Sequence, residues 1–213
     1  SLFIIYLPNF IDMKDEVKEP ISVYGNEFTY AEYLTWKVKE RIELIKGRIF
    51  KMSPAPARIH QRISRDMQFV MMNYFSGHTC ELYNAPFDVR LVDKTKKSKK
   101  DEDITTVFQP DLCVICDKEK LDDRGCIGAP DLIVEILSPG NSIKEMKYKY
   151  DLYEENGVRE YWVINYTHQL VYIYVLENGE YQGRKPYTVE ETAESTIFPN
   201  LKFDLKDIFK EED

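Results

Sequence analysis

Two carboxylates lie in strands that hydrophobicity alone would keep free of charge. Asp111 stands at the mouth of the apolar run 112–117, and Glu135 lies inside the apolar run 131–137. An ionised carboxylate in a buried strand is costly unless a positive group meets it. A divalent metal ion is the simplest such group, since hard cations such as Mg²⁺ bind carboxylate oxygens. Two strand carboxylates that hold a metal beside a lysine suit the cleavage of phosphodiester bonds.

A second interpretation of Glu135 needs no metal. The side chain would face solvent on a half-exposed strand, or it would pair with an arginine in the core. Composition does not decide between these interpretations.

The helix expected over 141–156 carries two lysines that could reach the carboxylates. Its apolar stripe is formed by Ile143, Met146, Tyr150 and Tyr153. At about 100° per residue, Lys147 and Lys149 each lie roughly 80° from the centre of that stripe, on opposite sides. Either side chain could bend over the edge of the sheet and bring its ammonium group to the carboxylates. Periodicity does not choose between them.

Apolar periodicity and turn signals predict the elements that position these residues. The capping box Thr29-Tyr-Ala-Glu32 opens a short helix, and apolar residues at helical spacing predict a long helix from Arg58 to Gly77. Lys46-Gly47 is the turn of a hairpin, and Glu177-Asn-Gly179 is the turn of a C-terminal hairpin. Strands are expected at 42–45, 48–52, 82–92, 106–117, 131–137, 161–165 and 170–176, and a last helix at 204–209.

The order of these elements predicts the fold class. A strand, a helix and a strand follow one another over 131–165, which makes the two strands parallel neighbours. The near-continuous apolar content of 106–117 and 131–137 indicates burial on both faces. We therefore expect an α/β domain over 29–213, with a mixed sheet flanked by helices and a C-terminal hairpin, after an N-terminal arm over 1–28.

Composition narrows the class of protein. The 213 residues are 43% hydrophobic, and the formal net charge of −8 argues against a broad nucleic-acid surface. No apolar run approaches the roughly 18 residues that a membrane span needs. Four cysteines are too few and too scattered for a disulfide framework, so we expect reduced thiols and a cytoplasmic protein. They are Cys80, Cys113, Cys116 and Cys126.

Seven segments carry a resemblance to known proteins. In order, they are Glu43-Leu-Ile-Lys-Gly47, His60-Gln61, Ala85-Pro-Phe-Asp-Val-Arg-Leu91, Gln109-Pro-Asp111, Gly128-Ala-Pro-Asp-Leu-Ile-Val-Glu-Ile-Leu-Ser-Pro139, Lys149 with Tyr153, and Gly157-Val-Arg-Glu-Tyr-Trp-Val163. This pattern resembles the PD-(D/E)XK nuclease superfamily and, more narrowly, the Uma-two family of proposed restriction endonucleases. The resemblance runs through about residues 29–210.

The resemblance implies a restriction-endonuclease-like fold in which Asp111 and Glu135 bind the metal. It favours Lys149 over Lys147 as the catalytic lysine, because the helix lysine of the family falls on Lys149. Leu137 departs from the superfamily pattern, which has a lysine two positions after the glutamate. We interpret Lys149 as the residue that fills this role.

Three further residues are auxiliary candidates. The resemblance makes Glu43 a third metal ligand or an orienter of a metal-bound water, with a solvent-facing hairpin residue as the alternative. His60 could contact a phosphate or position Glu43, although capping and surface roles are as common for a lone histidine. Ser138 could hold Lys149 or a metal-bound water.

The leading hypothesis is an endonuclease that hydrolyses DNA with Mg²⁺, for which Mn²⁺ could substitute. The alternative is a non-catalytic or partner-dependent nucleic-acid-binding module on the same fold, motivated by the net charge of −8 and by Leu137. A homodimer is a further expectation, since the aromatic strand Val171-Tyr-Ile-Tyr-Val175 would offer an exposed edge.

Overall fold

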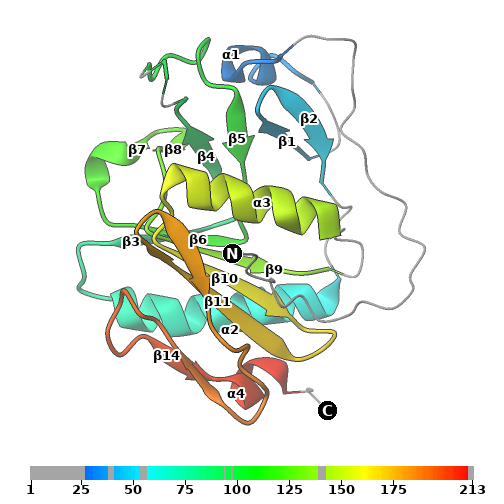
Figure 1. The fold of residues 1–213 in the computed structure, drawn as a ribbon, viewed down its shortest axis with the longest axis vertical. Helices are drawn as coiled ribbons and strands as arrows, with labels where there is room; N and C mark the ends of the chain where they lie inside the picture. Colours follow the sequence, from blue (N-terminus) through cyan, green and yellow to red (C-terminus); the bar gives the residue numbers. More distant parts are fainter. Residues whose placement is uncertain are drawn as a thin grey trace, which may run out of the picture.

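The computed structural model describes residues 27–37, 41–52, 57–93, 95–96, 98–138 and 143–210 (Figure 1). The helices are α1 (Tyr30–Tyr33), α2 (Arg58–Phe75), α3 (Ile143–Asn156) and α4 (Leu205–Phe209), with a 3₁₀ turn, η1 (Lys118–Lys120). The strands are β1 (Ile42–Ile45), β2 (Arg48–Lys51), β3 (Glu81–Asn84), β4 (Asp88–Leu91), β5 (Thr106–Phe108), β6 (Leu112–Ile115), β7 (Leu121–Asp122), β8 (Gly125–Ile127), β9 (Leu132–Ile136), β10 (Glu160–Asn165), β11 (Leu170–Glu177), β12 (Glu180–Gly183), β13 (Thr192–Glu194) and β14 (Lys202–Asp204). Within these ranges, every helix is too short or too polar to cross a membrane.

The strands form two sheets of six and one separate pair, so the predicted mixed α/β class is confirmed. The first sheet has the order β2-β1-β5-β4-β8-β7, and the second has the order β12-β11-β10-β9-β6-β3. β9 and β10 are parallel neighbours joined by α3, as the crossover predicts. The sequence predicts one central sheet, whereas the structure divides the strands between two.

Two of the predicted strands are each divided at a proline. The strand expected over 82–92 is β3 followed by β4, and the strand expected over 106–117 is β5 followed by β6. Pro86 and Pro110 stand at the two breaks and have no N–H group to donate to a ladder. At each break the chain passes from one sheet to the other. The second passage brings Asp111 to the start of β6.

The second sheet separates two apolar cores. On β9, Val134 and Ile136 pack in the core that includes α2, while Ile133 packs in the core that includes α3. Successive side chains of a strand point to opposite faces, so Glu135 lies on the α3 side with Ile133. Figure 1 shows α3 running across this sheet.

The C-terminal hairpin β11–β12 is confirmed, but the exposed edge expected at 171–175 is wrong. β11 pairs with β10 on one side and with β12 on the other, so β12 forms the edge. The proposed arm, residues 1–28, lies outside the described residues except for its last two. The first two residues of the helix expected over 141–156 also lie outside them.

The expectation of reduced cysteines is wrong for one pair, because Cys80 and Cys116 form a disulfide. β3 and β6 are antiparallel with Glu81 opposite Ile115, and one further step puts the two cysteines opposite each other. Their Cα atoms are 3.9 Å apart. Sequence spacing does not reveal this pairing, because it depends on the register of two strands. Cys113 and Cys126 are free and buried.

Glu160, at the start of β10, fastens the C-terminal segment to the second sheet. It is fully buried. Its Oε2 accepts hydrogen bonds from the Ser195 hydroxyl (3.1 Å) and from the N–H groups of Thr196 (3.0 Å) and Ile197 (2.9 Å). Its Oε1 accepts one from the indole N–H of Trp162 (2.6 Å). A buried carboxylate is tolerated where donors surround it in this way.

We expect Glu160→Ala to lower the free energy of unfolding by about 3–5 kcal/mol, because it leaves four donors without an acceptor. Urea denaturation at neutral pH measures this loss. The exposed Glu194→Ala, in the same C-terminal segment, is the control and should change stability by less than about 0.5 kcal/mol. Equal stability of the two variants would contradict the fastening role.

Candidate active site

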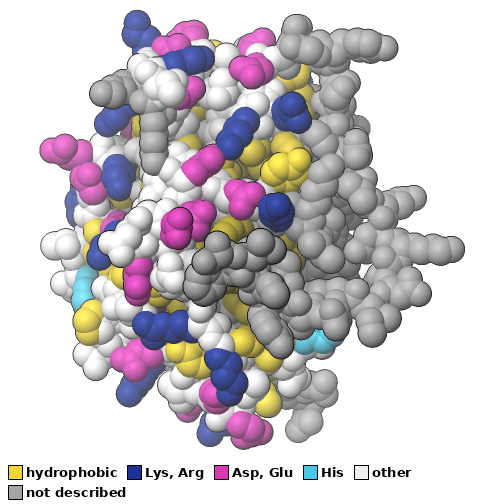
Figure 2. Space-filling view, viewed as in Figure 1, with side chains coloured by type: hydrophobic (Ala, Val, Ile, Leu, Met, Phe, Trp, Pro, Cys, Tyr) yellow, Lys and Arg dark blue, Asp and Glu magenta, His cyan; other side chains and the backbone are white. Residues whose placement is uncertain are grey.

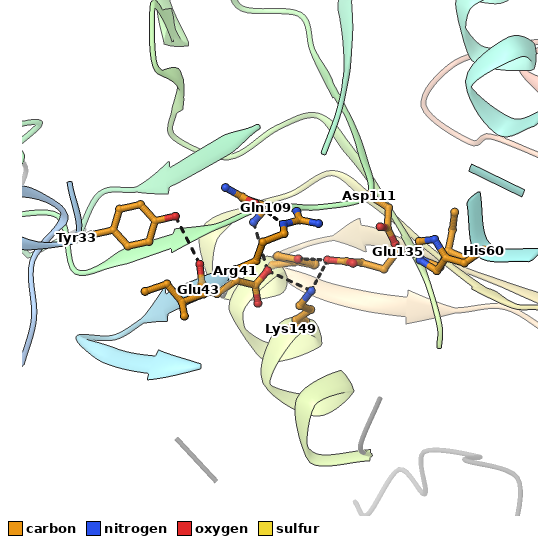
Figure 3. A network of polar contacts seen from close by, with 11 residues as sticks. Tyr33, Arg41, Glu43, His60, Gln109, Asp111, Glu135 and Lys149 are labelled. Atoms are coloured by element: carbon orange, nitrogen blue, oxygen red, sulfur yellow. Dashed lines mark hydrogen bonds and ion pairs between the residues drawn. The ribbon is translucent and has the colours of Figure 1, made fainter. Parts of the chain in front are cut away.

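Three carboxylates from three segments of the chain lie near one another beside α3 (Figure 3). The register of β6 against β9, extended by one residue, puts Asp111 opposite Glu135. Glu43 comes from β1 of the other sheet, and its Oε1 accepts a hydrogen bond from the backbone N–H of Gln109 (3.3 Å). Gln109 stands where the chain passes from β5 to β6. This passage therefore ties the two sheets together at the carboxylates.

Glu135 is buried, with 7% of its surface exposed, and one of its oxygens takes two donors from α3. Nζ of Lys149 lies 2.9 Å and the hydroxyl of Tyr153 lies 2.6 Å from Oε1. Residues four apart on a helix share a face, so α3 presents both donors to the strand. The hydroxyl role of Tyr153 is not predicted by the sequence pattern, which counts this residue in the apolar stripe.

Lys149 lies between two carboxylates. Its Nζ is 3.5 Å from Oε1 of Glu43, and the residue is only 8% exposed. Lys147, the other candidate on this helix, is exposed, and it contacts neither Glu43 nor Glu135 among the residues that the structure describes. The structure thus brings one of the two lysines to the carboxylates and leaves the other on the surface.

Asp111 is held by contacts from β9 and from α2. Its Oδ2 accepts a hydrogen bond from the N–H of Ile136 (2.7 Å) and lies 3.4 Å from Nε2 of His60. His60 comes from the first turn of α2 and is 6% exposed. Its described contacts are with Asp111 and with the backbone of Ile136. The sequence suggests contact with a phosphate or a role in positioning Glu43.

The site shifts the pKa values of two of these groups upward. Burial raises the pKa of Glu135 to about 7 from an ordinary 4.5; Lys149 acts against the shift, and the charges of Asp111 and Glu43 add to it. Burial lowers the pKa of His60, but its hydrogen bond to Asp111 and the nearby negative charges outweigh this effect and raise it above 6.5. Glu135 therefore changes charge near neutral pH.

A polar network behind Glu43 is not predicted by the sequence. The side chain of Gln109 accepts a hydrogen bond from Arg41 (2.8 Å) and donates one to Asp88 (2.8 Å). Asp88 also accepts one from the hydroxyl of Tyr30 (3.0 Å). Arg41 and Asp88 lie 68 and 21 positions from Gln109, so local spacing does not reveal these contacts. In the sequence, Gln109 stands out only as part of the Gln-Pro-Asp segment.

The carboxylates have the donor chemistry of a divalent-cation site. The described hydrogen bonds and ion pairs engage Oε1 of Glu43, Oδ2 of Asp111 and Oε1 of Glu135. Carboxylate oxygens are the ligands that Mg²⁺ takes in proteins.

The spacing of the donors differs from that of a formed metal site. Among the residues that the structure describes, no three His, Cys, Asp or Glu side chains are grouped closely enough to hold a metal ion. The ammonium group of Lys149 lies between two of the carboxylates, 3.5 Å from Oε1 of Glu43 and 2.9 Å from Oε1 of Glu135. The three carboxylates therefore have the ligand chemistry that a divalent ion needs, but the Lys149 ammonium group lies between two of them.

The last sequence candidate, Ser138, lies apart from this cluster in its described contacts, since it hydrogen-bonds the phenol of Tyr166. A cavity of about 400 Å³ also lies away from the carboxylates. Residues of β4, β5 and the end of α3 line it, among them Thr106, Leu152 and Glu155. None of the site candidates lines this cavity.

A family model, a relative and a solved structure match this chain. A family model described as "Uma2: Putative restriction endonuclease" matches residues 30–206. The "Uncharacterized protein slr1290" of Synechocystis sp. is 27% identical over 139 residues, which cover 64% of this chain and 67% of that protein. A crystal structure of "a putative nuclease belonging to DUF820" from Anabaena variabilis covers 85% of this chain and 97% of its own, with a TM-score of 0.64. At 21% identity, this last likeness shows a shared fold.

The raised pKa of Glu135 gives a direct test of the site in metal-free protein. We expect the side-chain carboxyl to titrate near pH 7, as ¹³C NMR in EDTA would measure. Tyr153→Phe removes a donor to the carboxylate, so the pKa should rise further; Asp111→Asn removes a negative charge, so it should fall. A midpoint near 4.5 in all three proteins would contradict the described burial and contacts.

Proposed function

This chain belongs to the Uma2 family, described as "Putative restriction endonuclease", and we propose that it hydrolyses DNA phosphodiester bonds as a metal-dependent endonuclease. The observation that carries the proposal is a set of three carboxylates from three segments of the chain beside a buried lysine. These residues are Glu43, Asp111, Glu135 and Lys149. The two-carboxylate and lysine arrangement is the one that the sequence resemblance implies.

In this proposal Glu43, Asp111 and Glu135 would hold a Mg²⁺ ion, and Mn²⁺ could replace it because it accepts the same ligands. When bound, the ion supplies Lewis-acid chemistry and positive charge at the phosphate. The N–H groups of Gln109 and Ile136 donate to one oxygen of Glu43 and one oxygen of Asp111, respectively. Such contacts orient the ligands before the ion arrives.

The other residues of the cluster act on the carboxylates and on the phosphate. The ammonium group of Lys149 orients the attacking water or stabilises the negative charge that grows on the phosphate oxygens. Tyr153 orients Glu135 through its hydrogen bond, and His60 orients Asp111. The sheet and α3 together shield these groups from bulk water, which strengthens each electrostatic contact.

The distribution of surface charge supports contacts with phosphate that are made close to the site. The net charge is −8. On the face that Figure 2 shows, acidic and basic side chains of the described residues are interspersed. A polyanion gains little long-range attraction from such a surface. In this proposal, Lys149 supplies positive charge to the phosphate at the site itself.

We expect the protein to nick supercoiled plasmid or cut single-stranded DNA in Mg²⁺ or Mn²⁺ and to be inactive in EDTA. Glu135→Gln and Asp111→Asn should each lower the cleavage rate by about 100-fold or more, because each removes a charged ligand while it keeps the side-chain shape. Gel-based cleavage rates of the variants, purified in parallel, give the comparison.

Asp151→Asn is the matched control, since it makes the same kind of change on an exposed carboxylate of α3. It should cleave at the wild-type rate. Metal-dependent cleavage that survives in Glu135→Gln would show that the site is elsewhere. Binding of DNA without cleavage by folded wild-type protein would favour the non-catalytic binding module.

A further inference from the structure

The Glu43–Glu135 pair already has a cation, and it is part of the protein. Nζ of Lys149 is 2.9 Å from Oε1 of Glu135 and 3.5 Å from Oε1 of Glu43. The three residues are 8%, 7% and 3% exposed, respectively. Two carboxylates buried side by side repel each other, and an ammonium group between them offsets part of that cost.

A divalent ion and this ammonium group compete for the same carboxylates. An ion bound to Glu43 and Glu135 would lie next to the Lys149 ammonium in its present position, and like charges at such separations in a shielded site repel strongly. Tyr153 does not replace the ammonium group, because its hydroxyl donates a hydrogen bond without carrying charge. The long, flexible stem of lysine lets the ammonium group move while the helix stays in place.

We propose that Lys149 is the internal counter-ion of the Glu43–Glu135 pair, and that a divalent cation binds by displacing its ammonium group. This inference rests on the proposed function and specifies how that site is regulated. Displacement couples two events: the carboxylates receive the metal, and the ammonium group becomes available to a phosphate. In the absence of metal, the same contacts keep the carboxylates paired and the lysine withdrawn from substrate.

A fixed structural ion pair would behave differently from a counter-ion that metal displaces. If the pair between Lys149 and the glutamates persisted with metal bound, removal of the lysine would weaken the site or leave metal affinity unchanged. If the metal must displace the ammonium group, removal of that group must strengthen metal binding at a pH where Glu135 is ionised, because the competitor is gone.

The test is the dissociation constant of Mn²⁺, measured by isothermal titration calorimetry without DNA. Lys149→Met keeps the length of the side chain and removes its charge, so we expect it to bind Mn²⁺ about tenfold or more tightly than wild type. Lys147→Met makes the same change on an exposed lysine of the same helix, and it should bind Mn²⁺ as wild type does.

Equal or weaker binding by Lys149→Met would overturn the counter-ion role and leave the nuclease proposal standing. If none of the three proteins bound Mn²⁺ at millimolar concentrations, both proposals would fail. Should Lys149→Met be unfolded in EDTA, its far-UV circular dichroism with Mn²⁺ decides. If Mn²⁺ restores the wild-type spectrum, the glutamate pair needs a cation for folding and the counter-ion role is supported. If Mn²⁺ does not restore it, the counter-ion role is contradicted.

Discussion

Glu135 carries a charge into the interior of a sheet, and most of the surrounding structure compensates for that placement. Burial opposes ionisation of its carboxyl group, and the neighbouring carboxylates oppose it further. Lys149 and Tyr153 act in the other direction from α3. α3 holds them there because it is the crossover between the parallel strands β9 and β10, and it packs on the sheet face to which Glu135 points. The crossover topology therefore positions the two groups on which the charge of Glu135 depends.

The connection between the two sheets supplies the rest of the site. Pro110 ends the pairing of β5, and the chain crosses to β6 with Gln109 on one side of it and Asp111 on the other. Gln109 holds Glu43, which belongs to the first sheet, while Asp111 joins Glu135 in the second. A single short segment thus brings together carboxylates that no one sheet could gather. His60 adds a contact from α2, across the second sheet.

Sequence patterns among neighbouring residues predict many of the helices, turns and site residues. The contacts that they miss depend on how distant strands and helices are aligned. The capping box at Thr29 and the hairpin turn at Lys46-Gly47 are confirmed, because both depend on neighbouring residues. Glu135 attracts notice because it is a charge in an apolar run. The choice between Lys147 and Lys149 needs the rotation of α3 over the sheet, which periodicity leaves ambiguous. The disulfide of Cys80 with Cys116 depends on strand register, and the contacts of Gln109 depend on which segments cross between the sheets.

The most direct test of the central claim is a crystal soaked in Mn²⁺, with the ion located from its anomalous scattering. The account predicts one strong peak about 2 Å from oxygens of Glu43, Asp111 and Glu135, with the Lys149 ammonium group moved away from Glu43. A peak at another place, or none among these carboxylates in a well-ordered crystal, would contradict it.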